Sequence, residues 1–191
     1  MQTAILAGAR HLFLTEGYER TTMDAVAAAV GASKMTLYRH YRSKEALFTG
    51  VVAEMCDQAI ADPHLPRILA RLPLRAGLET FAQLSLDAIF APESLALHRV
   101  VDAECRRFPE LGRLFYERGP AASIATLTAY LARNAKGLAP AEAARIAASF
   151  LSMVRGYEHM RALLGLEGPP QPRQRERQIA RGVDYVMRML K

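Results

Sequence analysis

The sequence predicts an all-α protein with a small N-terminal part and a larger C-terminal part, and three observations support this. Apolar residues recur at three- and four-residue spacing along most of the 191 residues, as on the buried face of a helix. Capping residues, glycines and prolines separate these segments. No stretch shows the alternation of apolar and polar residues that is typical of a strand.

The composition indicates a globular protein that lies outside membranes. Hydrophobic residues make up 51% of the chain, which is enough for a sizeable core, and no apolar run approaches the length of a bilayer span. Arg10 and His11 interrupt the first apolar stretch, which therefore reads as an amphipathic helix and not as a signal peptide. Cys56 and Cys105 are too few for a disulfide framework. We expect a cytoplasmic protein with no membrane partner.

The N-terminal part begins with a helix at about residues 2–16, and two short helices follow. Thr22 opens the second helix, because its hydroxyl can accept from backbone N–H groups of the first turn. Gly31 ends that helix, since glycine adopts a left-handed backbone at little cost. Ser33 caps a third helix at about residues 34–41. Two helices joined by such a turn form a helix-turn-helix.

The third helix has an outer face suited to nucleic acid. With Leu37 and Tyr41 inward, a step of about 100° per residue turns the other side chains to solvent. These outward residues are Lys34, Met35, Thr36, Tyr38, Arg39 and His40. From residue 33 to 44 there are four basic and no acidic residues, although residues 1–61 carry six of each. DNA binding therefore rests on the placement of charge. The alternative is a helical corner with a solvated basic face.

A longer helix, residues 44–61, is expected to link the two parts. Lys44 lies in its first turn, where a cation opposes the helix dipole unless an anion docks there. Pro63 and Pro66 then interrupt the helical pattern. We place the domain boundary here, with a DNA-binding domain at 1–61 and a C-terminal domain at 62–191. A short helix is expected at 67–72.

The C-terminal domain reads as helices at about 74–90, 92–108, 109–136, 140–164 and 173–190, with a break near Gly119 and Pro120 in the third. The last two carry enough small and apolar residues for a twofold four-helix interface between two copies. The expected interface residues are Ala147, Phe150, Leu151, Val154, Ile179, Val183, Val186, Met187 and Leu190. Packing of the terminal helix within one chain is the alternative.

A small, hydrophobic or amphipathic molecule held among these helices would suit the C-terminal domain. The candidate pocket residues are Phe81, Leu84, Leu97, His98, Val101, Asp102, Tyr130, Met153 and Tyr157. Each of them is also a good core residue.

No constellation in the sequence predicts an enzyme. The five histidines have no metal-ligand spacing, and there is no phosphate-binding loop. His98 and Asp102 are four residues apart, which suits a hydrogen-bonded pair. Cys105 beside Arg106 leaves open a redox-sensing protein with only generic DNA binding, whereas an inert buried cysteine is the commoner case. We expect no catalytic residues, metal or cofactor.

The N-terminal part resembles the DNA-binding domain of TetR-type transcriptional regulators. The matching residues are Thr22, Ala27, Gly31, Ser33, Thr36, Leu37, Tyr38, His40, Tyr41 and residues 43–48, all at the family's spacing. The chain departs from the pattern at Val26, Val30, Ala32 and Met35, and Tyr41 stands where the family has phenylalanine, which keeps the core character of that position. Met35 replaces a glycine on the DNA-facing side. Residues 106–120, RRFPELGRLFYERGP, resemble more loosely the AefR-like subgroup.

The resemblance implies a ligand-responsive repressor that binds a palindromic operator as a homodimer through its last two helices. Its partners would be double-stranded DNA, a second copy and an unidentified small-molecule effector. Family DNA-contact positions fall on Thr22, Lys34, Thr36, Tyr38, His40 and Lys44, and the outward Met35 and Arg39 join this set. We expect Thr22, Tyr38, His40 and Lys44 to hold phosphates, and Lys34, Met35, Thr36 and Arg39 to reach bases.

Overall fold

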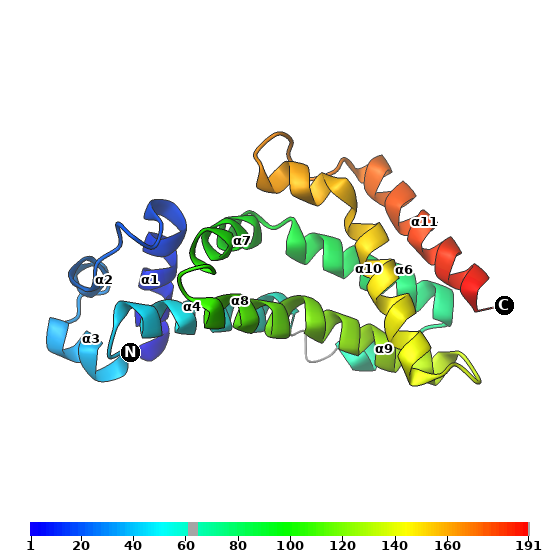
Figure 1. The fold of residues 1–191 in the computed structure, drawn as a ribbon, viewed down its shortest axis with the longest axis horizontal. Helices are drawn as coiled ribbons and strands as arrows, with labels where there is room; N and C mark the ends of the chain where they lie inside the picture. The colour runs from blue at the N-terminus through cyan, green and yellow to red at the C-terminus, as the bar shows by residue number, and fades with distance from the viewer. Residues whose placement is uncertain (61–64, 191) are drawn as a thin grey trace. The chain divides into compact units, whose positions relative to one another are not determined.

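The computed structural model describes residues 1–60 and 65–190. Over these residues the chain forms eleven α-helices and one π-helix, with no strand (Figure 1). This confirms the all-α prediction. None of the helices in the described part is long and apolar enough to span a bilayer.

The described chain packs into two compact units that do not follow chain order. One unit comprises Met1–Gln58 with Ala96–Arg118, and the other comprises Ala59–Leu95 with Gly119–Lys191. The predicted domain boundary, between residues 61 and 62, lies outside the described residues and stays a prediction. Chain order alone did not indicate that residues 96–118 pack with the N-terminal helices.

The first unit holds α1 (Gln2–Glu16), α2 (Met23–Ala29), α3 (Lys34–His40), α4 (Lys44–Ile60) and α8 (Pro109–Tyr116), together with most of α7 (Pro92–Glu104). Phe13 of α1 and Phe48 of α4 are buried at its centre, with ring centroids 4.8 Å apart. Leu37 of α3 and Val101 of α7 belong to the same buried cluster. The short helices α2 and α3 therefore pack on a core that includes residues of α7, a segment distant in the sequence.

The second unit holds α5 (Leu65–Leu69), α6 (Leu74–Ile89), α9 (Ala122–Asn134), α10 (Pro140–Leu163) and α11 (Pro172–Met189). Figure 1 shows α10 crossing between α9 and α11, and it packs against both. Leu78, Leu127, Phe150 and Val183 are fully buried at this crossing.

Most predicted helices agree with the structure to within two residues, and the differences have local causes. The helix expected at 92–108 ends at Glu104, since a turn precedes Pro109 and the residue before a proline disfavours helical geometry. The break expected near Pro120 is a π-helix, Glu117–Ala121, between α8 and α9. A proline lacks the N–H of a regular turn, which accounts for this wider turn.

One break was not predicted. Gly156 lies inside α10 with φ 62° and ψ −174°, a combination that is essentially restricted to glycine. The residues on either side remain helical. α10 therefore consists of two segments that meet at Gly156.

Most residues expected at a dimer interface are core residues of the single chain. Ala147, Phe150, Val154, Ile179, Val183 and Val186 are all buried within the second unit. The helices approach closely at Gly182, where an added Cβ would lie 2.8 Å from Val154 Cγ2. These six residues thus belong to the core of the second unit, and a dimer interface formed by α10 and α11 stays a prediction. Leu151, Met187 and Leu190 are partly buried at the edge of this packing.

The expected ligand-pocket residues do not lie together in one unit. Leu97, His98, Val101 and Asp102 belong to the first unit, whereas Phe81, Leu84, Tyr130, Met153 and Tyr157 belong to the second. Leu84, Met153 and Tyr157 are exposed. The Tyr130 hydroxyl donates to the carbonyls of Leu72 and Pro73 at 3.2 Å, so its polar atom already has a structural role.

Candidate nucleic-acid interface

Two side-chain caps define the corner between α2 and α3. The Thr22 hydroxyl accepts from the N–H of Ala25, and the Ser33 hydroxyl accepts from the N–H of Thr36, each at 3.1 Å. Between the helices, Gly31 has a φ of 63°, which a side chain would disfavour. These contacts satisfy N–H groups that have no partner within the helix. The sequence prediction of this corner is confirmed in both helices.

The outer face of α3 is as expected from its periodicity. Leu37 is fully buried, while Lys34, Tyr38, Arg39 and His40 are exposed and Thr36 is partly so. Met35 is 84% exposed. A protruding methionine with basic and hydroxyl-bearing neighbours provides both polar and apolar groups for recognition.

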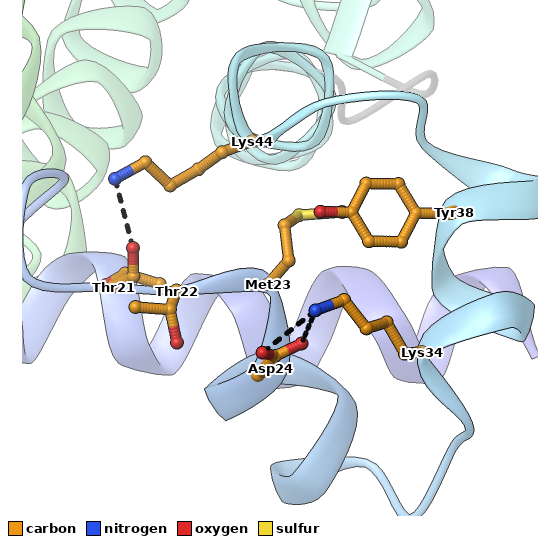
Figure 2. A pocket seen from close by; sticks show the side chains of 7 residues that line it. All are labelled: Thr21, Thr22, Met23, Asp24, Lys34, Tyr38 and Lys44. Carbon is orange, nitrogen blue, oxygen red and sulfur yellow. Dashed lines mark hydrogen bonds and ion pairs between the residues drawn. The ribbon is translucent and has the colours of Figure 1, made fainter.

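A shallow cavity of about 300 Å³ lies where α2, α3 and α4 begin. Its lining residues are Thr21, Thr22, Met23, Asp24, Lys34, Tyr38 and Lys44 (Figure 2). Four of the predicted DNA-contact residues, Thr22, Lys34, Tyr38 and Lys44, therefore lie at one site. Met35, Arg39 and His40 are on the adjoining exposed surface of α3.

Lys34 forms an ion pair across the corner. Its Nζ lies 2.9 Å from Asp24 Oδ1 and 3.0 Å from Asp24 Oδ2, and Figure 2 shows the two side chains pointing toward each other. The hydrogen bond and the negative charge of Asp24 raise the pKa of Lys34. In the free protein this lysine is therefore charged but already paired.

Lys44 has a different environment from the one expected. Its ammonium donates to the carbonyls of Tyr18, Glu19 and Thr21 at 2.9, 3.2 and 3.0 Å. The ammonium also lies 4.2 Å from the centroid of the Tyr18 ring, within the range of a cation–π contact. An ammonium group has three N–H donors, so the α1–α2 loop uses all of them. The phosphate contact expected of Lys44 would have to replace or share one of these bonds.

Tyr18 connects this loop to the segment between α7 and α8. Its ring stacks on Phe13 and meets Phe108 edge-on, with centroids 5.9 and 5.1 Å apart. Arg107 pairs with Glu19 in the same loop. Burial first, and the neighbouring Glu45 second, raise the pKa of the Tyr18 hydroxyl. The loop that precedes α2 is thus braced from two sides within the first unit.

The comparisons with known proteins agree with this site. Residues 5–51 match the family of bacterial regulatory proteins named tetR, and residues 76–189 match the C-terminal domain of AefR-like transcriptional repressors. The second match alone covers more than half of the chain. The chain belongs to the TetR family. This is a family of DNA-binding transcriptional regulators and not of enzymes.

Two solved structures resemble almost the whole chain. The flavonoid-responsive regulator FrrA is 35% identical, with 98% of this chain and 95% of that chain covered and a TM-score of 0.82. A TetR-family regulator from Mesorhizobium loti is 25% identical over the same shares, with a TM-score of 0.87.

Curated relatives match over shorter stretches. The repressor Rv1474c of Mycobacterium tuberculosis is 28% identical over 125 residues, which are 64% of this chain and 60% of that protein. The repressor AcnR of Corynebacterium jeikeium is 40% identical over 126 residues, 58% of this chain and 66% of that protein. The chain thus spans about three fifths of the length of the first relative.

Two ion pairs in this DNA-binding part of the TetR-family chain were not predicted from the sequence. Asp24 and Lys34 are ten residues apart on different helices, so no helical spacing indicated their pairing. Arg107 and Glu19 are separated by 88 residues, and only the fold brings them together. The signal available in the sequence is the acidic Asp24 in the first turn of α2, but a favourable interaction with the helix dipole explains such a residue equally well.

The other polar candidates of this TetR-family chain have structural environments. His98 Nε2 lies 3.7 Å from Asp102 Oδ1 on α7. The Cys105 thiol is half-buried and lies 3.5 Å from the carbonyl oxygen of Asp102. Burial raises the pKa of the Cys56 thiol to about 11, which disfavours the reactive thiolate at neutral pH. Within the described chain, no group of three His, Cys, Asp or Glu side chains is placed to hold a metal ion.

Proposed function

We propose that the protein is a homodimeric repressor that binds a palindromic operator through α3 and is released by a small molecule. The observation that carries this proposal is the exposed outer face of α3, with Lys34, Met35 and Arg39 pointing away from a helix whose Leu37 is fully buried. Such a recognition helix fits the major groove, where each base pair presents a distinct set of donors, acceptors and methyl groups.

The side chains divide by what each can contact. Arg39 and Lys34 donate hydrogen bonds and suit guanine O6 and N7, while the Met35 side chain suits a thymine methyl group. Thr22, Tyr38 and His40 lie exposed beside them and suit phosphate oxygens, which set the register of the protein on the duplex. Thr36 is partly buried and bonded to Ser33, so it has the shortest reach of the proposed base contacts.

An exposed apolar surface on α10 supports the dimer. After the break at Gly156, Tyr157 and Met160 of α10 and its C-cap Leu164 are 82%, 58% and 67% exposed, and their spacing of three and four residues places them on one side of the helix. Apolar side chains gathered in this way are typical of an interface. A second copy related by a twofold axis would cover the same face on both chains.

The effector is proposed to be an amphipathic aromatic molecule. FrrA, whose name describes it as flavonoid-responsive, is 35% identical to this chain over 98% of its length. Planar polyphenols are therefore the first class to test. To act as inducers they must bind the non-DNA-binding state more tightly than the DNA-bound state. A cytoplasmic location follows from the DNA target and stays part of the proposal.

The decisive experiment is selection of genomic fragments on the purified full-length protein at about physiological salt. We expect recovery of a palindrome whose half-sites are about one helical turn apart, and loss of retention on addition of the effector. Retention that depends on salt but not on sequence would contradict the operator proposal. It would instead support a ligand- or redox-sensing protein with generic DNA binding.

A further inference from the structure

The proposed function assigns no role to the carboxylate of Asp24, which lies among the proposed DNA-contact residues. Asp24 lies in the first turn of α2, is exposed, and lines the same cavity as Thr22, Tyr38 and Lys34. An acidic side chain at a surface that meets DNA repels phosphates. Its position therefore calls for an explanation beyond the stability of a helix with only seven residues.

We propose that Asp24 is a positioning residue that decides which DNA groups the Lys34 ammonium contacts. Its carboxylate holds Lys34 in the free protein and on non-operator DNA, and Lys34 leaves it only where an operator base accepts from the ammonium. This inference rests on the proposed function, since it concerns how α3 contacts operator and non-operator DNA.

The geometry provides an exchangeable pair. Both carboxylate oxygens of Asp24 lie within 3.0 Å of Lys34 Nζ, which joins α2 to α3 (Figure 2). The two side chains are 62% and 65% exposed. A pair so accessible to water contributes little to stability, and DNA can reach both partners. The ion pair can thus open without disturbing Leu37 or the core beneath it.

The charge balance of the pair determines which DNA groups Lys34 contacts. A lysine that neutralises a phosphate releases counterions, and this term is independent of sequence. Lys34 paired with Asp24 is already neutralised and supplies none of that term. At an operator, guanine O6 and N7 offer acceptors that depend on sequence. Asp24 therefore keeps Lys34 from the phosphates of non-operator DNA, whereas the base contacts of an operator offset the cost of opening the pair.

The test compares the full-length wild type with Asp24→Asn and with Glu110→Gln as a matched control. Glu110 is an exposed acid in the first turn of α8, so its loss changes the net charge and a helix terminus in the same way. Binding to the selected operator fragment and to a scrambled fragment is measured between about 50 and 200 mM salt.

For Asp24→Asn we expect binding to the scrambled fragment to tighten about two- to fivefold. Its plot of log affinity against log salt should steepen by about 0.9, the contribution of one added phosphate contact. Operator binding should tighten by at least as much, because the operator no longer has to open the ion pair, so the ratio between the two affinities does not fall. Glu110→Gln should match the wild type in slope and in ratio.

Lys34→Gln tests the pair from the other side. Because Lys34 contributes no counterion release on scrambled DNA, this variant should keep the wild-type salt slope there and lose affinity for the operator. Asp24→Asn added to Lys34→Gln should then leave the slope unchanged. A shallower slope for Lys34→Gln on scrambled DNA would overturn the inference, because Lys34 would already contact phosphates.

The two proposals fail in different ways. If the wild type prefers an operator but Asp24→Asn behaves as Glu110→Gln does, Asp24 only stabilises α2 and this inference is wrong. If the wild type shows no preference for any fragment, the proposed function fails and this inference falls with it.

Discussion

At the residue scale, Lys44 is the side chain whose role the structure changes most. Three backbone carbonyls of the α1–α2 loop accept from its ammonium, and the Tyr18 ring lies beneath it. If Lys44 affects DNA binding through this loop, it is a positioning residue. A positioning residue stabilises the free protein, whereas a phosphate ligand does not, so stability measured without DNA distinguishes the two roles.

We predict that Lys44→Ala lowers the free energy of unfolding by about 1–3 kcal/mol, because it removes charge-assisted hydrogen bonds to three carbonyls, two of them in partly buried surroundings. The loss appears as a lower Tm without DNA. Affinity for all DNA sequences should fall together, with little change in the salt slope. The exposed Arg42 provides the control, since Arg42→Ala removes the same charge nearby and should leave the Tm unchanged. A normal Tm with a salt slope shallower by about 0.9 would instead assign Lys44 to a phosphate.

Arg39 is the residue for which direct base contact has the clearest test. It is exposed on the outer face of α3, and a guanidinium can donate two hydrogen bonds to guanine. Arg39→Ala should relax preference at one or two base pairs and weaken operator binding by about 1–3 kcal/mol. Binding to a series of single-base operator variants measures this. An unchanged order of preference among those variants would remove Arg39 from the base-reading residues.

Residue orientation was the part of the site most open to prediction. The burial of Leu37 and the exposure of Met35 both follow from the period of a helix. The caps formed by the Thr22 and Ser33 hydroxyls follow from the preference of these residues for helix N-termini. The pairing of Asp24 with Lys34 and the hydrogen bonds of the Lys44 ammonium to the α1–α2 loop did not follow. They depend on how three helices meet, which local sequence does not encode.

At the element scale, the break in α10 is the feature with the sharpest consequence. Gly156 adopts φ 62° and ψ −174°, and an added Cβ would lie 2.2 Å from Glu158 Oε2 and 2.8 Å from Gln178 Nε2. The backbone geometry disfavours any side chain, and the ends of the Glu158 and Gln178 side chains would have to move to make room. The periodic apolar residues on both sides of Gly156 concealed the break, because a helical period continues across a single irregular residue.

We predict that Gly156→Ala lowers the free energy of unfolding by about 1–3 kcal/mol, the cost of a strained backbone position. Gly168→Ala serves as the matched control. An added Cβ there has no atom within 4 Å, and Gly168 has no positive φ, so its stability should stay within about 0.5 kcal/mol. Chemical denaturation of both variants measures the difference. Equal stability would mean that α10 straightens at no cost.

At the scale of the whole molecule, the units were harder to predict than the elements. Helices from α1 to α11 follow from periodicity and from Pro and Gly positions, whereas the packing of residues 96–118 with the N-terminal helices depends on contacts distant in sequence. The same limit explains the dimer residues. Phe150 and Val183 have the spacing of an interface, yet spacing is identical whether the partner helix belongs to the same chain or to another.

The dimer surface therefore has to be sought among apolar side chains that the single chain leaves exposed, and Tyr157 is the most exposed of those on α10. We predict that Tyr157→Asp weakens dimerisation at least tenfold, because a carboxylate buried between apolar side chains without a partner costs more than about 1.4 kcal/mol. Analytical ultracentrifugation measures the monomer–dimer equilibrium of this variant, and Tyr116→Asp on the surface of α8 serves as the control.

The same variant connects assembly to recognition. Two reading heads on one dimer bind the second half-site at a high effective concentration. Tyr157→Asp should therefore lose most of its affinity for the palindrome and keep its weak affinity for a single half-site, while Tyr116→Asp keeps both. A dimeric Tyr157→Asp beside a monomeric Tyr116→Asp would place the interface on α8. If both variants are monomeric at concentrations where the wild type is also monomeric, palindrome binding requires another explanation than a preformed dimer.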